Sequence, residues 1–154
     1  MNIFYLHHNP YKAATFFYDK HKVKMILECA QMLCTAHHVH DNGDNVPYKK
    51  AHLNHPSTIW CRQNTRHYFW LYEHMLALGH EYTHRYGKIH KSIIKCKEPL
   101  RLAPINMPTY KFEQPPQCMP DEFKSDCAIH AYWAYYIGEK HVVAAKDEMI
   151  KKLN

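Results

Sequence analysis

The sequence has few glycines, no long apolar run and no closely paired cysteines, and each absence excludes a class of protein. Only four glycines occur in 154 residues, so a glycine-rich phosphate loop of a P-loop ATPase or a Rossmann domain is excluded. No apolar run reaches the roughly 18 residues of a membrane span. The first residues also lack the basic region and apolar core of a secretion signal. The six cysteines form no Cys-x-x-Cys pair, and we expect buried thiols in a cytoplasmic protein.

Histidine, tyrosine and basic residues are abundant instead. The chain has 15 histidines, 12 tyrosines and 20 lysines and arginines, with a formal charge of +6. Histidine changes its charge near neutral pH, and lysine and arginine bind phosphate. This composition favours an anionic partner, and we expect no membrane association.

Capping residues and apolar periodicity predict a mainly α-helical fold, a single compact helical domain over residues 1–154 with a short N-terminal strand at 2–6. Asn9-Pro10 and Asp19 are typical helix starts, and Gly87 is a typical helix end. A proline-rich segment at 98–120 is expected to wrap the domain as an ordered arm. The expected helices cover 10–17, 19–36, 56–86 with a possible bend, 89–97 and 139–152, with a restart near 119–122 and a loop at 37–54.

The second expected helix has two faces. Its apolar face, expected in the core, consists of Val23, Ile26, Leu27, Ala30, Leu33 and Cys34. A neighbouring stripe carries Lys20, Lys24, Glu28, Gln31 and Thr35, because residues three or four apart lie one above another. This stripe is either a solvated surface or one wall of a cleft.

Residues 80–90 spell HExxHxxGxxH, the metzincin protease signature. His80 and His84, one helical turn apart, would share a zinc ion with His90, and Glu81 would act as general base. Two features oppose this interpretation. Histidine is so frequent that chance matches are common, and the preceding residues predict helices and loops where metzincins have a mixed sheet.

Four blocks of the sequence resemble a largely uncharacterised family of phage-encoded proteins. The blocks are 19–28 with 31–33; His55-Pro56 with Trp60 and Arg62; 81–83 with 85–88 and 90–92; and 115–117 with 119–122, Tyr135-Tyr136 and Glu139-Lys140. The family pattern does not require histidine at positions 80 and 84. The resemblance therefore favours a function without zinc.

That family is in turn distantly similar to the pyrimidine-dimer DNA glycosylases of the endonuclease V group. The similarity implies a helical protein that acts on damaged DNA. Enzymes of this group use a free terminal amine on a small processed residue. Met1-Asn2 departs from that pattern, so a Schiff-base mechanism would need a lysine in its place.

The matched blocks contain the parts of a nucleotide site. We expect His21, Glu28, His55 and His90 to act in proton transfer, which contributes roughly 10²–10⁴-fold when the geometry is right. Cationic side chains would hold phosphate, tyrosine and tryptophan rings would stack on a base, and Gln31 would read a base edge. The expected ligand-binding residues are Lys20, Lys24, Gln31, Trp60, Arg62, Tyr82, Arg85, Tyr86, Lys91, Tyr136 and Lys140.

Three functions remain open on the sequence alone. The first is binding of a phosphate-bearing nucleotide, either a modified or damaged DNA nucleotide or a nucleotide immune signal of a host, with cleavage by metal-independent acid-base chemistry as a nuclease, glycosylase-like hydrolase or lyase. The second is a non-catalytic, anti-defence module that sequesters the nucleotide, expected as a homo-oligomer. The third is the zinc protease. We expect no cofactor in the first two and zinc in the third.

Overall fold

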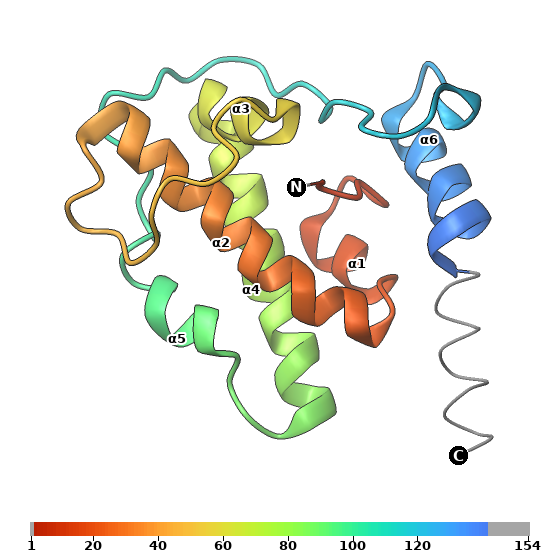
Figure 1. Cartoon of the computed structure of the whole chain (residues 1–154), viewed down its shortest axis with the longest axis horizontal. Coiled ribbons are helices and arrows are strands. Elements are labelled where there is room, and N and C mark those ends of the chain that lie inside the picture. The colour runs from red at the N-terminus through yellow and green to blue at the C-terminus, as the bar shows by residue number, and fades with distance from the viewer. Residues whose placement is uncertain (1, 142–154) are drawn as a thin grey trace.

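Two long helices cross at the centre of the computed structural model, which describes residues 2–141 (Figure 1). They are α2 (Asp19–Asp41) and α4 (Thr65–Tyr86). The short helix α1 (Pro10–Thr15) packs on α4, and α3 (Pro56–Gln63) packs on α2. The described residues are mainly α-helical, as the sequence predicts, and they contain no strand. None of these helices is both long and apolar enough to cross a bilayer.

The expected strand at residues 2–6 is wrong, because the segment is buried and extended but pairs with no other strand. Ile3, Tyr5 and Leu6 are each at most 2% exposed. The backbone finds its partners among tryptophan side chains: Trp133 Nε1 donates to the Leu6 carbonyl at 2.8 Å, and Trp70 Nε1 donates to that of His8 at 2.7 Å. A short run of consecutive apolar residues is thus a buried core segment whose carbonyls bond to side chains.

Helix α2 is longer than the sequence indicates and ends at Asp41 instead of near Ala36. The last turn is stabilised by His37, whose Nδ1 lies 2.9 Å from Asp41 Oδ2 and whose Nε2 lies 2.9 Å from the buried Tyr68 hydroxyl. Part of the expected loop at 37–54 is therefore helical. The N-cap is Tyr18, and Asp19 is the first helical residue.

The apolar face of α2 is buried as predicted at Ile26, Ala30, Leu33 and Cys34. Leu27 is an exception, with 40% of its surface exposed. It lies beside the lysine and glutamate stripe and helps to line a surface hollow.

Helices α3 and α4 are separate because Asn64 is extended (φ −155°, ψ 160°) and caps α4. Its side-chain oxygen accepts from Arg66 N at 2.8 Å and His67 N at 3.4 Å. The sequence left open whether the helix continues or bends at this point. Gly87 ends α4 in the left-handed conformation, as predicted, with φ +70°.

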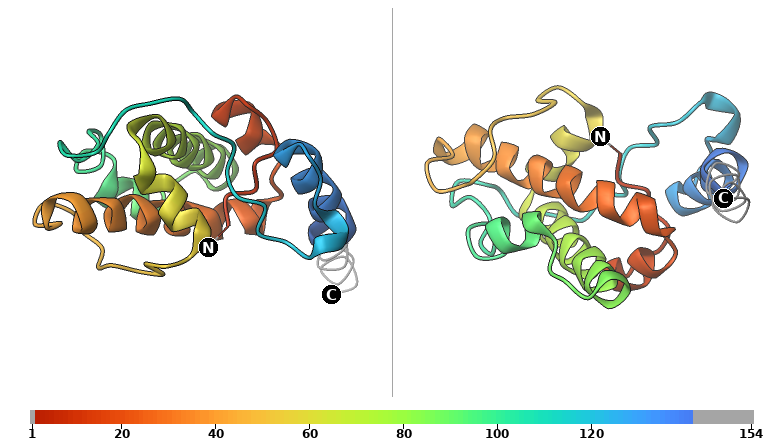
Figure 2. Two further views of the ribbon diagram at one scale, coloured as in Figure 1. Left: turned by 90° about the horizontal axis from the view of Figure 1, so that it is seen from above. Right: turned by 60° about the horizontal axis from the view of Figure 1, so that its bottom comes forward.

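The segment from 98 to 120 has no regular helix or strand and follows the outside of the helices to α6 (Figure 2). Its carbonyls at Pro108 and Glu113 accept hydrogen bonds from Thr65 N and Trp60 Nε1. The helix expected near 119–122 is a single 3₁₀ turn, η1 (Asp121–Phe123). The remaining elements are α5 (Lys91–Cys96), α6 (Ala128–Tyr135) and the π-helical turn η2 (Tyr136–His141). The expected helix at 139–152 lies almost wholly outside the described residues.

Candidate functional site

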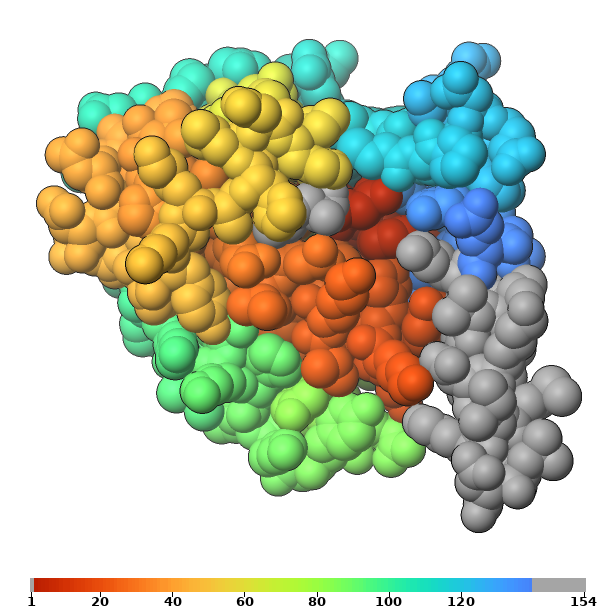
Figure 3. Space-filling model, in the orientation of Figure 1, coloured from red at the N-terminus to blue at the C-terminus, as the bar shows by residue number. Residues whose placement is uncertain are grey.

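A hollow of about 520 Å³ lies between α2 and α5. Four of the predicted site residues line it, and they are Lys24, Glu28, His90 and Lys91. Figure 3 shows this face of the molecule, with α2 at its centre, the segment before α3 on one side and α5 on the other. Lys24 and Lys91 are exposed, and Glu28 is half-buried. The hollow therefore combines a carboxylate with cationic side chains, the pair of properties that a phosphate-bearing substrate and acid-base chemistry require.

Two hydroxyl groups that the sequence did not single out also line this hollow. Tyr48 Oη lies 2.9 Å from Ser92 Oγ, and Lys95 Nζ lies 5.8 Å from the centre of the Tyr48 ring. Tyr48 comes from the irregular segment before α3, where no periodicity marks it. Only the packing of that segment against α5 reveals its place.

His90 is held as the N-cap of α5. Its Nδ1 accepts from Ser92 N at 3.0 Å, and its ring also makes a hydrogen bond with the backbone of Val23 on α2. Burial lowers the pKa of His90, and the Val23 bond opposes this shift. The His90 ring therefore joins α5 to α2 through these two hydrogen bonds.

The charge of Glu28 also acts on His55, the N-cap of α3. His55 Nδ1 accepts from Ser57 N at 3.1 Å. Burial and neighbouring positive charges lower the pKa of His55, and the charge of Glu28 raises it. Glu28, which lines the hollow, therefore acts electrostatically on His55, another of the four predicted proton-transfer residues.

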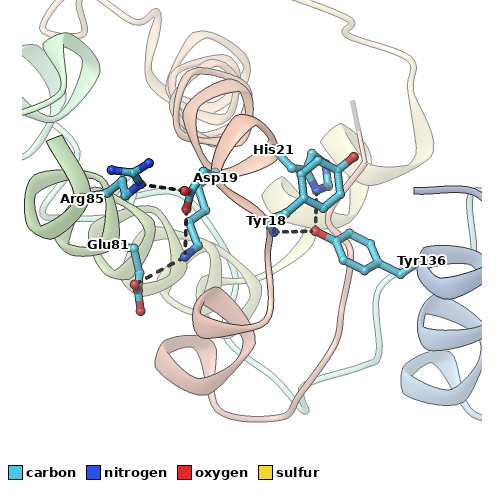
Figure 4. A network of polar contacts seen from close by, with 7 residues as sticks. Tyr18, Asp19, His21, Glu81, Arg85 and Tyr136 are labelled. Atoms are coloured by element: carbon cyan, nitrogen blue, oxygen red, sulfur yellow. Dashed lines mark hydrogen bonds and ion pairs between the residues drawn. The ribbon is translucent and has the colours of Figure 1, made fainter. Parts of the chain in front are cut away.

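His21 and Tyr136 lie in a separate, buried aromatic cluster (Figure 4). The Tyr136 hydroxyl accepts from Tyr18 N at 3.1 Å and lies 3.2 Å from His21 Nδ1. The His21 ring stacks on Phe17 with 4.9 Å between the ring centres. Burial raises the pKa of Tyr136. These contacts place His21 and Tyr136 in the packing between α6 and α2, away from the residues that line the hollow.

Arg85 takes part in an ion-pair network between α2 and α4 (Figure 4). Its Nε lies 2.9 Å from Asp19 Oδ2. Lys22, in the same network, lies 3.4 Å from Glu81 Oε2 and 3.9 Å from Asp19 Oδ1. Arg85 is thus engaged with a carboxylate of its own chain, although 63% of its side chain is exposed.

Trp60 and Arg62, predicted to bind the ligand, have structural contacts instead. Trp60 is 4% exposed and stacks on His67 with 4.3 Å between ring centres, so its faces are not open to a base. Arg62 Nη1 donates to the Leu53 carbonyl at 2.8 Å and fixes the segment before α3.

The remaining predicted ligand-binding residues are spread over α2 and α4. Lys20 is exposed and Gln31 half-buried on the stripe that carries Glu28. Tyr82 packs against His90 with 4.9 Å between the ring centres, and Tyr86, 44% exposed, packs on Tyr82. The Lys140 side chain lies outside the described part of the chain.

The zinc alternative finds no support in the geometry. His80 and His84 line a different, largely apolar groove of about 560 Å³ between α4 and α5, whereas His90 caps α5 on the other side. Among residues 2–141, no three His, Cys, Asp or Glu side chains are grouped so that they could hold a metal ion. Glu81, the general base of that hypothesis, pairs with Lys22.

Residues 1–95 match the family described as pyrimidine dimer DNA glycosylase. The match covers more than half of the chain, so the protein belongs to this family. The matched region contains every residue that lines the hollow between α2 and α5, together with His55. Membership indicates a glycosylase-like protein that binds DNA. Searches of curated proteins and of solved structures gave no match.

Proposed function

We propose that the protein detaches a damaged pyrimidine base from its sugar in DNA. It cleaves the N-glycosidic bond of that base with Glu28 as the general base. The observation that supports this most strongly is the place of Glu28, a half-buried carboxylate in a hollow edged by Lys24 and Lys91. All three residues lie in the region that matches the glycosylase family.

Glu28 acts as the base in this proposal. It takes a proton from a water molecule while the water oxygen forms a bond to C1′ of the deoxyribose. The C1′–N bond breaks, and its electron pair leaves with the base. The proton then passes from Glu28 to the departing base, so that a base-free sugar is formed. In a pyrimidine dimer the detached base stays covalently joined to the neighbouring pyrimidine. The charge of Glu28 also acts on His55 and raises the pKa of that ring against the effect of burial.

Lys24 and Lys91 hold the phosphates on either side of the damaged nucleotide. Lysine binds phosphate as a mobile point charge and releases counterions from DNA, so binding weakens as salt rises. Lys20, one turn before Lys24 on the exposed stripe of α2, extends this contact along the strand. The half-buried ring of Tyr48 offers a surface for stacking inside the hollow.

The experiment is incubation, in EDTA, with a duplex that carries one pyrimidine dimer. Photoreversal of the dimer then frees any base whose N-glycosidic bond has been cleaved, and alkali breaks the strand at the base-free sugar. The proposal predicts base release with chelator present. Sodium borohydride added during turnover distinguishes two routes: a trapped protein–DNA adduct would show that an amine such as that of Lys24 has replaced water as the nucleophile. A folded protein that binds the duplex but leaves every glycosidic bond intact would overturn the proposal.

A second candidate function is retention of a nucleotide without cleavage. Two of the four predicted proton-transfer residues favour it, because His21 is buried in an aromatic cluster and His90 caps α5. The ligand would be a damaged DNA nucleotide or a nucleotide signal of host defence, held by the same lysines. Equilibrium binding followed by chromatography distinguishes this function, because the ligand would be recovered intact.

A further inference from the structure

Helix α6 and its C-cap Tyr136 lie beyond the family-matched residues, yet three hydrogen bonds join them to the N-terminal part of the chain. The Tyr132 hydroxyl donates to Asn2 Oδ1 at 2.7 Å, and Trp133 Nε1 donates to the Leu6 carbonyl at 2.8 Å. Tyr136 accepts from Tyr18 N at 3.1 Å. Figure 1 shows α6 alongside the N-terminal segment and α1. A helix outside the family-matched region therefore holds the N-terminal segment, which lies inside that region.

The Tyr132 hydroxyl is at the centre of the first contact. Tyr132 is fully buried, and its hydroxyl also lies against the Pro116 carbonyl and accepts from Cys118 N at 3.3 Å. Asn2 is fully engaged as well: Oδ1 accepts from Ile3 N at 2.8 Å, and Nδ2 donates to the Cys118 carbonyl at 2.7 Å. One hydroxyl thus joins α6, the proline-rich arm and the first residues of the chain. Each contact replaces hydration that burial removes.

The same chain of contacts continues to the candidate site. Cys118 Sγ lies 3.6 Å from Ser57 Oγ, and Ser57 is fully buried in the first turn of α3. Ser57 N donates to Nδ1 of His55, which the charge of Glu28 influences. Tyr132 is therefore connected to His55 through Cys118 and Ser57, although 77 positions separate the two residues in the sequence.

We propose that Tyr132 is a positioning residue, which holds the N-terminal segment and the first turn of α3 and so fixes His55, the N-cap of that helix. This inference rests on the proposed function, since its consequence is a correctly assembled glycosylase site. Tyr132 acts through Asn2, Cys118 and Ser57 and does not itself contact the substrate. A displacement of about 1 Å in such an arrangement lowers the rate of a positioned reaction by about 10²-fold.

The test is Tyr132→Phe, which removes one oxygen and keeps the buried ring. We expect kcat for base release to fall about tenfold or more while KM stays within about twofold, because binding by Lys24 and Lys91 is retained. The matched control is Tyr110→Phe. The Tyr110 hydroxyl also bonds a backbone carbonyl, that of Gln63 at 2.9 Å, but it lies on the exposed part of the arm. An equal fall in both variants would overturn the proposal.

A second measurement separates this inference from the proposed reaction. The titration of His55, followed by NMR and assigned with His55→Asn, is expected to shift in Tyr132→Phe and to stay unchanged in Tyr110→Phe. Asn2→Ala should shift the same titration. This variant provides the test if Tyr132→Phe does not fold. If the wild-type protein releases no base but the titration shifts, only the proposed reaction fails. If base release is normal and His55 titrates identically in all variants, the positioning role is wrong.

Discussion

The charge of Glu28 on α2 acts on His55, the N-cap of α3, across the boundary between the two helices. Burial lowers the pKa of His55, neighbouring positive charge lowers it further, and Glu28 opposes both effects. This relationship joins two residues that are 27 positions apart in the sequence. It defines the position from which the carboxylate acts.

Replacing Glu28 with glutamine is expected to lower the pKa of His55 further, because the only effect that raises it is removed while burial remains. The measurement is the pH dependence of the His55 ring signals by NMR. A pKa that stays constant or rises in the variant would show that the two residues do not interact.

Lys24→Ala and Lys91→Ala are each expected to weaken binding to duplex DNA and to reduce its dependence on salt. Each lost phosphate contact lowers the slope of log K against log salt concentration by about 0.9. The control is Lys111→Ala on the exposed proline-rich arm, distant from the residues of the hollow. Fluorescence anisotropy over a series of salt concentrations gives the slopes. Equal slopes for wild type and both hollow variants would exclude these lysines from the DNA contact.

His74 is expected to make the fold sensitive to acid. Burial lowers its pKa to about 4 from the usual 6.5, although Nδ1 donates to the Pro10 carbonyl. The unfolded chain therefore binds a proton that the folded chain does not, and stability falls as the pH drops from about 6.5 towards 4. The slope is up to about 1.4 kcal/mol per pH unit.

The measurement for His74 is the free energy of unfolding by urea between pH 7 and pH 4.5, in wild type and in His74→Phe. The variant keeps a ring against Trp70 but cannot take up the proton, so its loss of stability with acid should be shallower. Parallel curves for the two proteins would contradict this assignment.

Gly43 is expected to tolerate alanine less well than Gly87, although both have positive φ. A Cβ on Gly43 would lie 2.2 Å from His38 Nδ1, and His38 is itself bonded to the Tyr48 carbonyl at 2.8 Å. Gly87 has no atom within 4 Å of such a Cβ. Gly87→Ala should therefore cost about 1 kcal/mol from conformation alone, and Gly43→Ala should cost more. The measurement is the thermal unfolding of both variants. An equal loss of stability in the two would show that the His38 side chain can move aside without an energetic cost.

The sequence predicted those features of the fold that depend on local chemistry. Asn9 and Gly87 mark helix ends because capping needs only neighbouring backbone groups. The features that failed depend on distant partners. The segment at 2–6 is extended against tryptophan side chains, and α2 extends to Asp41 because His37 meets Tyr68.

The candidate site was predictable in part for the same reason. The spacing of Lys24 and Glu28 places them on one face of α2, and that face does line the hollow. The ion pair of Arg85 could not be predicted, because its partner Asp19 lies on another helix. The burial of Trp60 could not be predicted either, because no local sequence feature indicates it. Tyr48 and Ser92 could not be found, since only the tertiary packing brings them together.

The most direct test is the rate of N-glycosidic bond cleavage in a pyrimidine-dimer duplex under single-turnover conditions, measured as base release after photoreversal of the dimer. It is compared between wild type, Glu28→Gln and Glu73→Gln. Glu73 is an exposed glutamate on α4 outside the hollow and serves as the matched control. We predict that the wild type and Glu73→Gln release the base equally, and that Glu28→Gln is slower by about 10²-fold or more while it still binds the duplex. A Glu28→Gln protein that releases the base at the wild-type rate would contradict the proposed function.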